Sequence, residues 1–221
     1  DEMPPIDALF LTHDHYDHIK SVGQLGAKMH IPVYATHQVH RAIRNNPMIH
    51  QNLNGSSKLI EKGKTFKIED FHITPFEVPH DSTDNVGYYF EFGGQRLTLA
   101  TDVGSITDEI AHYMGKANHL IIESNYDEDL LKNGSYPAHL KQRITCGTGH
   151  LSNRQTADFL ANNFSSQFRN IWLCHLSGDN NNPELAYKTI SETLIKKGIN
   201  IGEDVGLHVL GRNVLSAKTN F

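Results

Sequence analysis

The sequence predicts an α/β protein whose functional residues follow the ends of buried strands. Short apolar runs typical of strands alternate with segments in which apolar residues recur at helical spacing. Three of the runs, 9–11, 120–122 and 171–174, are followed closely by histidine or glutamate. Open α/β sheets bind ligands at the carboxyl ends of their strands, so we expect a ligand site at that edge.

The predicted elements of the N-terminal half begin with a strand at 9–11. A helix is expected from Asp17 or His18 to about His30, because Ile19, Val22, Leu25 and Met29 recur at helical spacing. A strand at 32–35, a helix at 37–44 and a loop rich in Asn, Gly and Ser at 45–65 follow.

Residues 66–92 have a β pattern, and Gly93-Gly94 is a two-residue turn signal that leads into a strand at 96–100. Further strands are expected at 120–122, 171–174 and 205–210. Helices are expected at 138–144, 153–163 and 183–197, the second capped by Ser152 or Asn153.

Composition bounds the class of protein. A chain of 221 residues can form one sizeable core, so we expect a single domain over 1–221. No apolar run approaches the ~20 residues of a membrane span, and no signal-peptide pattern opens the chain. Two cysteines favour a cytoplasmic location, and both are expected to be small buried residues. The net charge of -5 means that any phosphate-binding surface must be local.

The segment His13-Asp14-His15-Tyr16-Asp17-His18 is the strongest chemical signal. His13 and His15 point the same way in an extended chain, and Asp17 and His18 come where the predicted helix starts. Imidazole and carboxylate together suit zinc, manganese or iron, and a pair of ions needs roughly six to eight ligands. We therefore predict a metal site that begins here.

Thr12 to His18 resembles the signature of the metallo-β-lactamase superfamily, and later segments resemble its other motifs in order: 78–81 with Gly87-Tyr88, 101–104 and 173–177. The resemblance implies an αββα sandwich in a single domain, here expected to lack part of the N-terminal sheet because the motif begins at residue 13. It also implies two divalent metal ions, zinc or manganese with iron possible. The implied ligands are His13, His15 and His80 for one ion and Asp17, His18 and His175 for the other, with Asp102 bridging.

The run from Glu123 to Asn153 is more specific and resembles the bacterial YycJ/WalJ/VicX branch, described as exonuclease-like DNA hydrolases. The resemblance implies a nucleic acid substrate. His150, oriented by Glu123, would protonate the leaving group or stabilise the phosphate, and Asp17 would orient the nucleophile or accept its proton. Lys141, Arg143 and Arg154 would contact backbone phosphates.

Alternatives remain within the same fold. Asp102 and His15 stand where β-lactamases and diiron flavoproteins of the superfamily carry other ligands, so those two functions are excluded. A hydrolase of small lactones or thioesters, or a non-catalytic metal-bound regulatory protein, stays open. The native metal, DNA against RNA, exonuclease against endonuclease action and the oligomeric state are also open.

Overall fold

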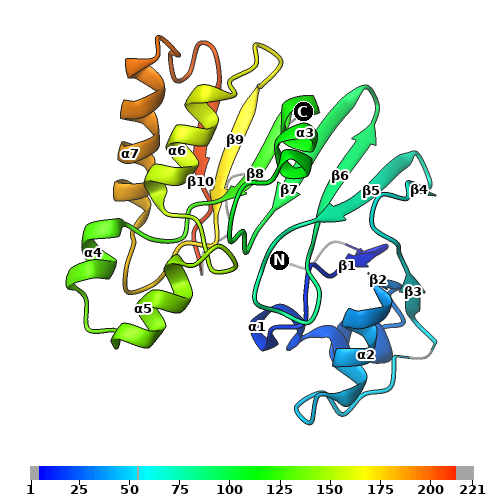
Figure 1. Cartoon of the computed structure of the whole chain (residues 1–221). Helices are drawn as coiled ribbons and strands as arrows, with labels where there is room; N and C mark the ends of the chain where they lie inside the picture. The colour runs from blue at the N-terminus through cyan, green and yellow to red at the C-terminus, as the bar shows by residue number, and fades with distance from the viewer. Residues whose placement is uncertain (1–4, 54, 213–221) are drawn as a thin grey trace. The chain divides into compact units, whose positions relative to one another are not determined.

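The computed structural model describes residues 5–53 and 55–212, and they form a mixed α/β structure, as predicted (Figure 1). The chain divides into two compact units. The small unit comprises 1–64 and 82–86, and the large unit comprises 65–81 and 87–221. The expectation of a single domain stays a prediction.

The small unit is built on a parallel three-stranded sheet in the order β1-β2-β3. Its strands are β1 (Leu9–Phe10), β2 (Val33–Ala35) and β3 (Ser57–Leu59), and its helices are α1 (Tyr16–Ile19), the π-helix η1 (Gly23–Lys28) and α2 (His37–Asn45). Thr36 caps α2 by accepting a hydrogen bond from the backbone N–H of Val39 at 3.4 Å. A buried apolar cluster joins these elements, and it includes Ile19, Val33 and Ile43.

The prediction of one helix from 17 to 30 is wrong, because the chain forms the short α1 and then η1. Two glycines allow the second segment to pack closely on its neighbours. A Cβ on Gly23 would lie 2.1 Å from Gln51 Oε1, and one on Gly26 would lie 2.6 Å from Val33 Cγ2. Met29 N–H donates to Gln24 O, the five-residue step of a π-turn.

The prediction that 45–65 is all loop is also wrong. It misses β3, whose residues are largely exposed and give no alternating pattern. Pairing with β2 makes this segment a strand, with Lys58 opposite Tyr34.

The large unit is built on a seven-stranded sheet in the order β10-β9-β8-β7-β6-β5-β4. The strands are β4 (Phe66–Ile68), β5 (Phe71–Glu77), β6 (Val86–Phe92), β7 (Gln95–Ala100), β8 (His119–Glu123), β9 (Asn170–Cys174) and β10 (Gly206–Val209). The predicted Gly93-Gly94 hairpin is confirmed: Phe92 pairs with Gln95, and both glycines have positive φ. Strands β7 to β10 are parallel, so their carboxyl ends share one edge of the sheet.

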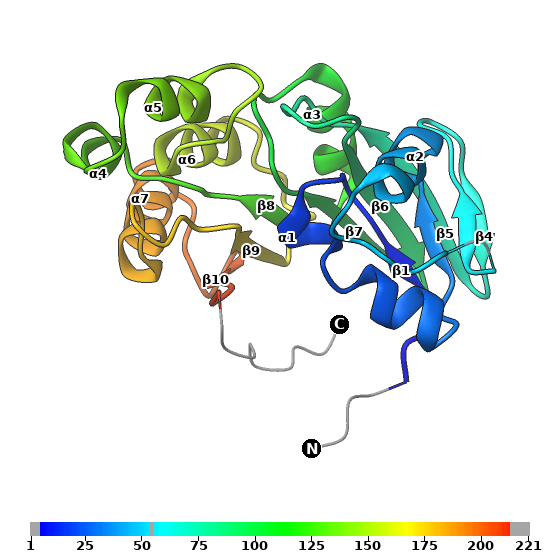
Figure 2. The ribbon, with the colours of Figure 1, turned by 90° about the horizontal axis from the view of Figure 1, so that it is seen from below.

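The helices of the large unit are α3 (Asp108–Lys116), α4 (Glu128–Asn133), α5 (Ala138–Thr145), α6 (Asn153–Asn162) and α7 (Pro183–Lys196). Helices α6 and α7 lie side by side, with α7 against β10, whereas α3 packs on β5 and β7 (Figures 1 and 2). Ser152 caps α6 in a capping box with Gln155, which confirms the predicted start. Helices α3 and α4 were not expected.

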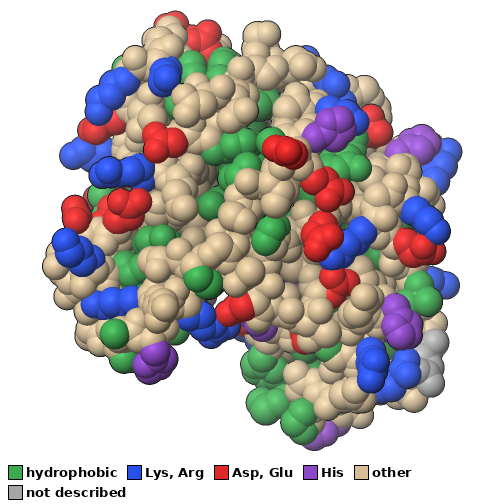
Figure 3. Space-filling view, viewed as in Figure 1, with side chains coloured by type: hydrophobic (Ala, Val, Ile, Leu, Met, Phe, Trp, Pro, Cys, Tyr) green, Lys and Arg blue, Asp and Glu red, His purple; other side chains and the backbone are tan. Residues whose placement is uncertain are grey.

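The surface gives two further facts. In the described part of the chain no helix is both long enough and apolar enough to cross a membrane. On the face shown in Figure 3, basic and acidic side chains are interspersed over α4, α6 and α7 of the large unit. That mixture agrees with the expectation that any phosphate-binding surface is local.

Candidate metal centre

Three histidines of the small unit gather where β1 leads into α1. The ring centroid of His13 lies 4.7 Å from that of His15 and 4.1 Å from that of His18. Thr12 Oγ1 lies 3.0 Å from His13 Nδ1, and Asp17 Oδ2 lies 3.6 Å from His18 Nε2. The extended segment after β1 and the first turn of α1 therefore place three imidazoles beside one carboxylate.

Asp14 lies between the first two histidines and makes different contacts. Its carboxylate accepts hydrogen bonds from the backbone N–H of Thr83 at 2.9 Å and from the Thr83 hydroxyl at 2.6 Å. Asp84, one residue further, accepts from the Thr36 hydroxyl at 2.6 Å and pairs with Lys62 at 2.5 Å. These contacts hold segment 82–86 against the rest of the small unit.

The large unit has its own cluster at the carboxyl ends of its parallel strands. Asp102 follows β7, Glu123 ends β8 and His175 follows β9, while His150 precedes α6. One ligand atom from each of these four residues lies within 4.8 Å of the others. Asp102 and His175 have left-handed backbones, with φ of 54° and 56°, a conformation that is uncommon for non-glycine residues.

Glu123 is the centre of this cluster and is fully buried. Its Oε1 lies 2.8 Å from His150 Nδ1 and 2.7 Å from His175 Nδ1. Its Oε2 accepts from the backbone N–H of Val103 at 2.7 Å and of Leu151 at 3.2 Å. Burial by itself would raise the pKa of Glu123, but hydrogen bonds and charge attraction from the two histidines outweigh burial and hold the pKa at about 2.

The contacts of Glu123 decide which histidine nitrogens face the site. When Nδ1–H of His150 and of His175 donates to the carboxylate, the lone pair of each neutral ring is on Nε2. A carboxylate that holds the far nitrogen of a histidine is the usual support behind a metal-binding imidazole. Glu123 is therefore suited to orient two histidines at once.

A close approach of backbone segments sets the position of His150. A Cβ on Gly104 would lie 2.3 Å from Thr148 Cα and 2.4 Å from Gly147 O, so only glycine leaves room for the 147–149 loop there. The same loop contacts His80, whose Nδ1 lies 3.1 Å from Gly149 O. The loop therefore positions His150 and supports His80.

Three histidines converge on one carboxylate oxygen of Asp102. Its Oδ1 lies 3.4 Å from His175 Nε2, 3.6 Å from His80 Nε2 and 3.9 Å from His150 Nδ1. The first two distances exceed a normal hydrogen bond. Two ligands of one zinc-like ion, each about 2.1 Å from it at a tetrahedral angle, stand about 3.4 Å apart. The donor types and spacing in the large unit thus fit a divalent cation.

The three predicted substrate-binding cations already have partners within the large unit. Lys141 Nζ donates to the carbonyl oxygens of Lys132 at 2.7 Å and Gly134 at 2.8 Å. Arg143 forms a two-pronged ion pair with Asp81. Arg154 is the most exposed of the three and lies 3.6 Å from Glu128. Lys141 of α5 therefore stabilises the end of α4 and the segment that connects the two helices.

Sequence reasoning missed a buried asparagine network behind the cluster. Asn125 Nδ2 donates to the carbonyl oxygen of His175 at 2.9 Å. Asn181 Nδ2 donates to the carbonyl oxygens of Ser124 at 2.9 Å and Asn125 at 3.0 Å, and it contacts Asn153 Oδ1. These partners are 28 to 57 positions apart, so no local spacing could indicate them.

The expectation of two buried cysteines is wrong for Cys146, which is exposed after α5, whereas Cys174 at the end of β9 is partly exposed. Hydrogen bonding to Thr148 lowers the pKa of the Cys146 thiol. Burial of the thiol raises the pKa of Cys174. The two thiols therefore differ in ionisation as well as in position.

Comparison with known proteins gives a family and relatives. A family profile described as "Beta-lactamase superfamily domain" matches residues 1–164. The chain is 33% identical over 204 residues to "Exodeoxyribonuclease YycJ" of Bacillus anthracis, covering 92% of this chain and 76% of the relative. It is 34% identical over 199 residues to "Exodeoxyribonuclease WalJ" of Streptococcus pneumoniae, covering 90% and 74%.

Solved structures agree on the fold. The metallo-β-lactamase fold protein YhfI of Bacillus subtilis has a TM-score of 0.66 at 16% identity, over 93% of this chain and 75% of that one. Zn²⁺-bound PqqB of Methylobacterium extorquens has a TM-score of 0.67 at 18% identity, over 93% and 71%. At such low identity these two similarities bear on the fold alone.

Proposed function

The chain belongs to the beta-lactamase superfamily and is a metal-dependent hydrolase, and from that premise we propose that it is a phosphodiesterase that removes nucleotides from the ends of DNA. The relatives that cover most of the chain are named exodeoxyribonucleases, which supports DNA as the substrate. The observation that carries the proposal is the contact of one buried carboxylate, Glu123, with both His150 and His175.

The proposed centre holds two divalent cations, zinc or manganese, with iron as a further option. Following the family pattern, His13, His15 and His80 would hold one ion, Asp17, His18 and His175 would hold the other, and Asp102 would serve both. The gathering of His13, His15 and His18 in the small unit supports this assignment, as does the convergence of His80 and His175 on Asp102 in the large unit.

Divalent cations held by such donors activate water as a nucleophile and neutralise charge on a phosphodiester. The side chains of the protein supply orientation and proton transfer. Asp17 orients the attacking water or accepts its proton. His150 is held through Nδ1 by Glu123, so its Nε2 faces away from the carboxylate. When both ring nitrogens carry a hydrogen, Nε2–H can donate a proton to the leaving sugar oxygen or a hydrogen bond to the phosphate.

The three cationic side chains proposed to contact the DNA backbone differ in how free they are to do so, because each already has a partner in the protein. Arg154 is the strongest candidate for a phosphate contact, because its side chain is exposed and its Nε lies as far as 3.6 Å from Glu128 Oε2. Arg143 can reach a phosphate only in exchange for Asp81, and we assign Lys141 mainly to the support of α4 and α5. A DNA substrate also agrees with the cytoplasmic location expected from the sequence.

The test is hydrolysis of end-labelled single- and double-stranded DNA and RNA with manganese or zinc. We compare the native chain with Asp102→Asn and with Asp158→Asn, a matched change at an exposed position of α6. Stepwise release of nucleotides from DNA by the native chain and Asp158→Asn, and none by Asp102→Asn, is the expected result.

Two outcomes contradict the proposal in different ways. Equal activity in Asp102→Asn and the native chain would remove Asp102 from the chemistry. No cleavage of any nucleic acid, together with turnover of lactones or thioesters, would replace a phosphodiester substrate with an acyl substrate.

A further inference from the structure

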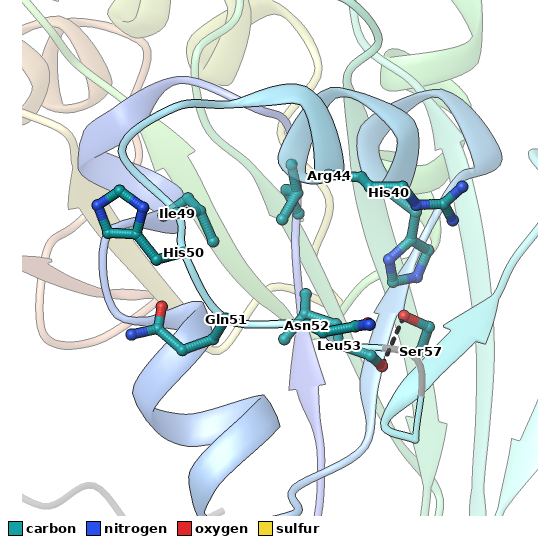
Figure 4. A pocket seen from close by; sticks show the side chains of 9 residues that line it. His40, Arg44, Ile49, His50, Gln51, Asn52, Leu53 and Ser57 are labelled. Atoms are coloured by element: carbon teal, nitrogen blue, oxygen red, sulfur yellow. Dashed lines mark hydrogen bonds between the residues drawn. The ribbon is translucent and has the colours of Figure 1, made fainter.

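The small unit contains a pocket of about 570 Å³ between the last turns of α2 and the chain that leads to β3 (Figure 4). Its volume falls in the range of pockets that bind small molecules. The pocket is lined by His40, Ile43, Arg44, Ile49, His50, Gln51, Asn52, Leu53 and Ser57. All nine residues belong to the small unit, so the pocket is separate from the large-unit cluster.

The path of the chain explains why the pocket is lined by both polar and apolar residues. Ile49 and Leu53 are buried in the core of the small unit, at 9% and 7% exposure. The three polar residues between these two anchors, 50–52, are exposed and line the pocket. The missing side chain of Gly23 leaves the space that Gln51 Oε1 occupies, which keeps this segment close to η1.

The charge of the lining favours an anion. Among the nine described residues that line the pocket none is acidic, whereas Arg44 supplies a cationic group and His50, Gln51 and Asn52 supply hydrogen-bonding groups. Arg44 and Asn52 lie near His40 and Ser57 at one end, and His50 and Gln51 lie at the other (Figure 4). His40 is buried and its Nε2 lies 3.1 Å from Lys58 O, so its ring is held in one position in the lining of the pocket.

We propose that this pocket binds a nucleotide, with Arg44 and Asn52 as donors to its phosphate group at one end and His50 and Gln51 as hydrogen-bond partners of its base at the other. The apolar side chains of Ile43, Ile49 and Leu53 pack against the base. Guanidinium and amide groups are the usual partners of phosphate oxygens. The anion site is argued from the small unit alone, and only the choice of nucleotide rests on the proposed function. The source of the phosphate is either a free mononucleotide or a DNA strand end.

The experiment is calorimetric titration of the full chain, as purified, with deoxyadenosine monophosphate and with deoxyadenosine. Three variants are compared: Arg44→Gln, His50→Gln and Arg41→Gln. Arg41 is an exposed arginine of the same helix that does not line the pocket, so it controls for the loss of one charge. Arg44→Gln should weaken nucleotide binding about tenfold, the loss expected for one charge-assisted hydrogen bond.

His50→Gln should weaken binding in the same direction, and Arg41→Gln should leave it unchanged. Deoxyadenosine, which lacks the phosphate, should bind at least tenfold more weakly than the nucleotide. Competition by a 5′-phosphorylated oligonucleotide would identify a strand end as the source, and failure to compete would identify the free nucleotide. The proposal is overturned if Arg44→Gln and Arg41→Gln bind the nucleotide equally well.

The two proposals fail separately. Binding in the pocket is an equilibrium measurement on residues that are not proposed metal ligands. DNA hydrolysis lost in Asp102→Asn but nucleotide binding unaffected by Arg44→Gln would remove the pocket and keep the nuclease. The reverse pattern would keep the pocket and remove the nuclease.

Discussion

The histidines of the small unit and the cluster of the large unit are assembled in opposite ways. His13, His15 and His18 come from six consecutive residues, and a strand end followed by a helical turn is enough to gather them. In the large unit, Glu123 contacts residues 27 and 52 positions away. The first arrangement is a property of local conformation, and the second exists only when strands β7, β8 and β9 pair in register.

This difference predicts which substitutions are tolerated. A carboxylate on the local motif can lose its charge without exposing buried partners. A carboxylate in the assembled cluster holds several backbone and side-chain donors, which lose a buried acceptor when it is removed. A substitution in the large-unit cluster should therefore destabilise several contacts at once. A substitution in the small-unit motif should affect only the contacts of the residue that is changed.

The largest contrast is expected between Glu123→Ala and Asp17→Asn. Glu123→Ala leaves two histidines and two backbone N–H groups without their buried acceptor, so the free energy of unfolding should fall by about 3–5 kcal/mol. Asp17 has a side chain that is 67% exposed, and its change to Asn should stay within about 0.5 kcal/mol. Urea unfolding followed by far-ultraviolet circular dichroism measures both variants, because it reports the helices and strands of both units. Equal urea midpoints for the two variants would show that the cluster of the large unit is no more sensitive to substitution than the motif of the small unit.

The next largest effect is expected from Gly104→Ala. The new Cβ would meet backbone atoms of Gly147 and Thr148, so the loop must shift and the unfolding free energy should fall by about 1–3 kcal/mol. Because the shift moves His150, the rate of DNA hydrolysis should fall by more than the loss of folded protein explains. Gly147→Ala is the matched control, since its Cβ would meet nothing within 4 Å. Full activity in both variants would show that this close approach does not position His150.

A smaller effect is expected from Asp14→Ala in the small unit. Loss of the two hydrogen bonds to Thr83 should reduce local stability by about 1 kcal/mol. Hydrogen exchange at 82–86 should become faster, while exchange at β8 and β9 stays the same. Asp7→Ala, at an exposed position before β1, serves as the control. Unchanged exchange at 82–86 would show that Asp14 does not hold this segment.

The smallest effect concerns thiol reactivity and needs no substitution. Hydrogen bonding to Thr148 lowers the pKa of Cys146, so this exposed thiol should react first with iodoacetamide near pH 8. Burial raises the pKa of Cys174, which should react only when the large unit opens. Mass spectrometry of the alkylated peptides gives the two rates. Because both cysteines are in the large unit, protection of Cys174 reports on that unit alone.

The same difference explains how much could be predicted from sequence. Elements with a strong pattern, such as β8, β9 and α7, were predicted within one or two residues, because burial imposes the pattern. Helix α3 has a readable signal in the cap Thr107 and the buried pair Ile110 and Met114, although it is not among the predicted elements. Strand β3 has no local signal, since pairing with β2 produces it. Helical spacing predicts a helix through 23–28 but not its π-helical form, which close packing at glycine favours.

For the site, the family resemblance predicts one contact, that of Glu123 with His150, and the structure confirms it, but the other contacts could not be predicted. The six-residue motif indicated metal chemistry by its spacing alone. That Glu123 serves both His150 and His175 depends on the register of β8 on β9, in which Glu123 lies opposite Cys174. The role of Asn181 depends on loops that no pattern in the sequence relates.

The left-handed backbones of Asp102 and His175 have a consequence for laboratory evolution. Glycine adopts this conformation without the steric cost that a Cβ imposes, so it would relax the backbone at these two positions. Selection for heat resistance alone should therefore drift towards Gly at both sites and discard the carboxylate and the imidazole. A lineage stabilised in this way would gain thermal tolerance and lose turnover, and a screen must score both to retain the enzyme.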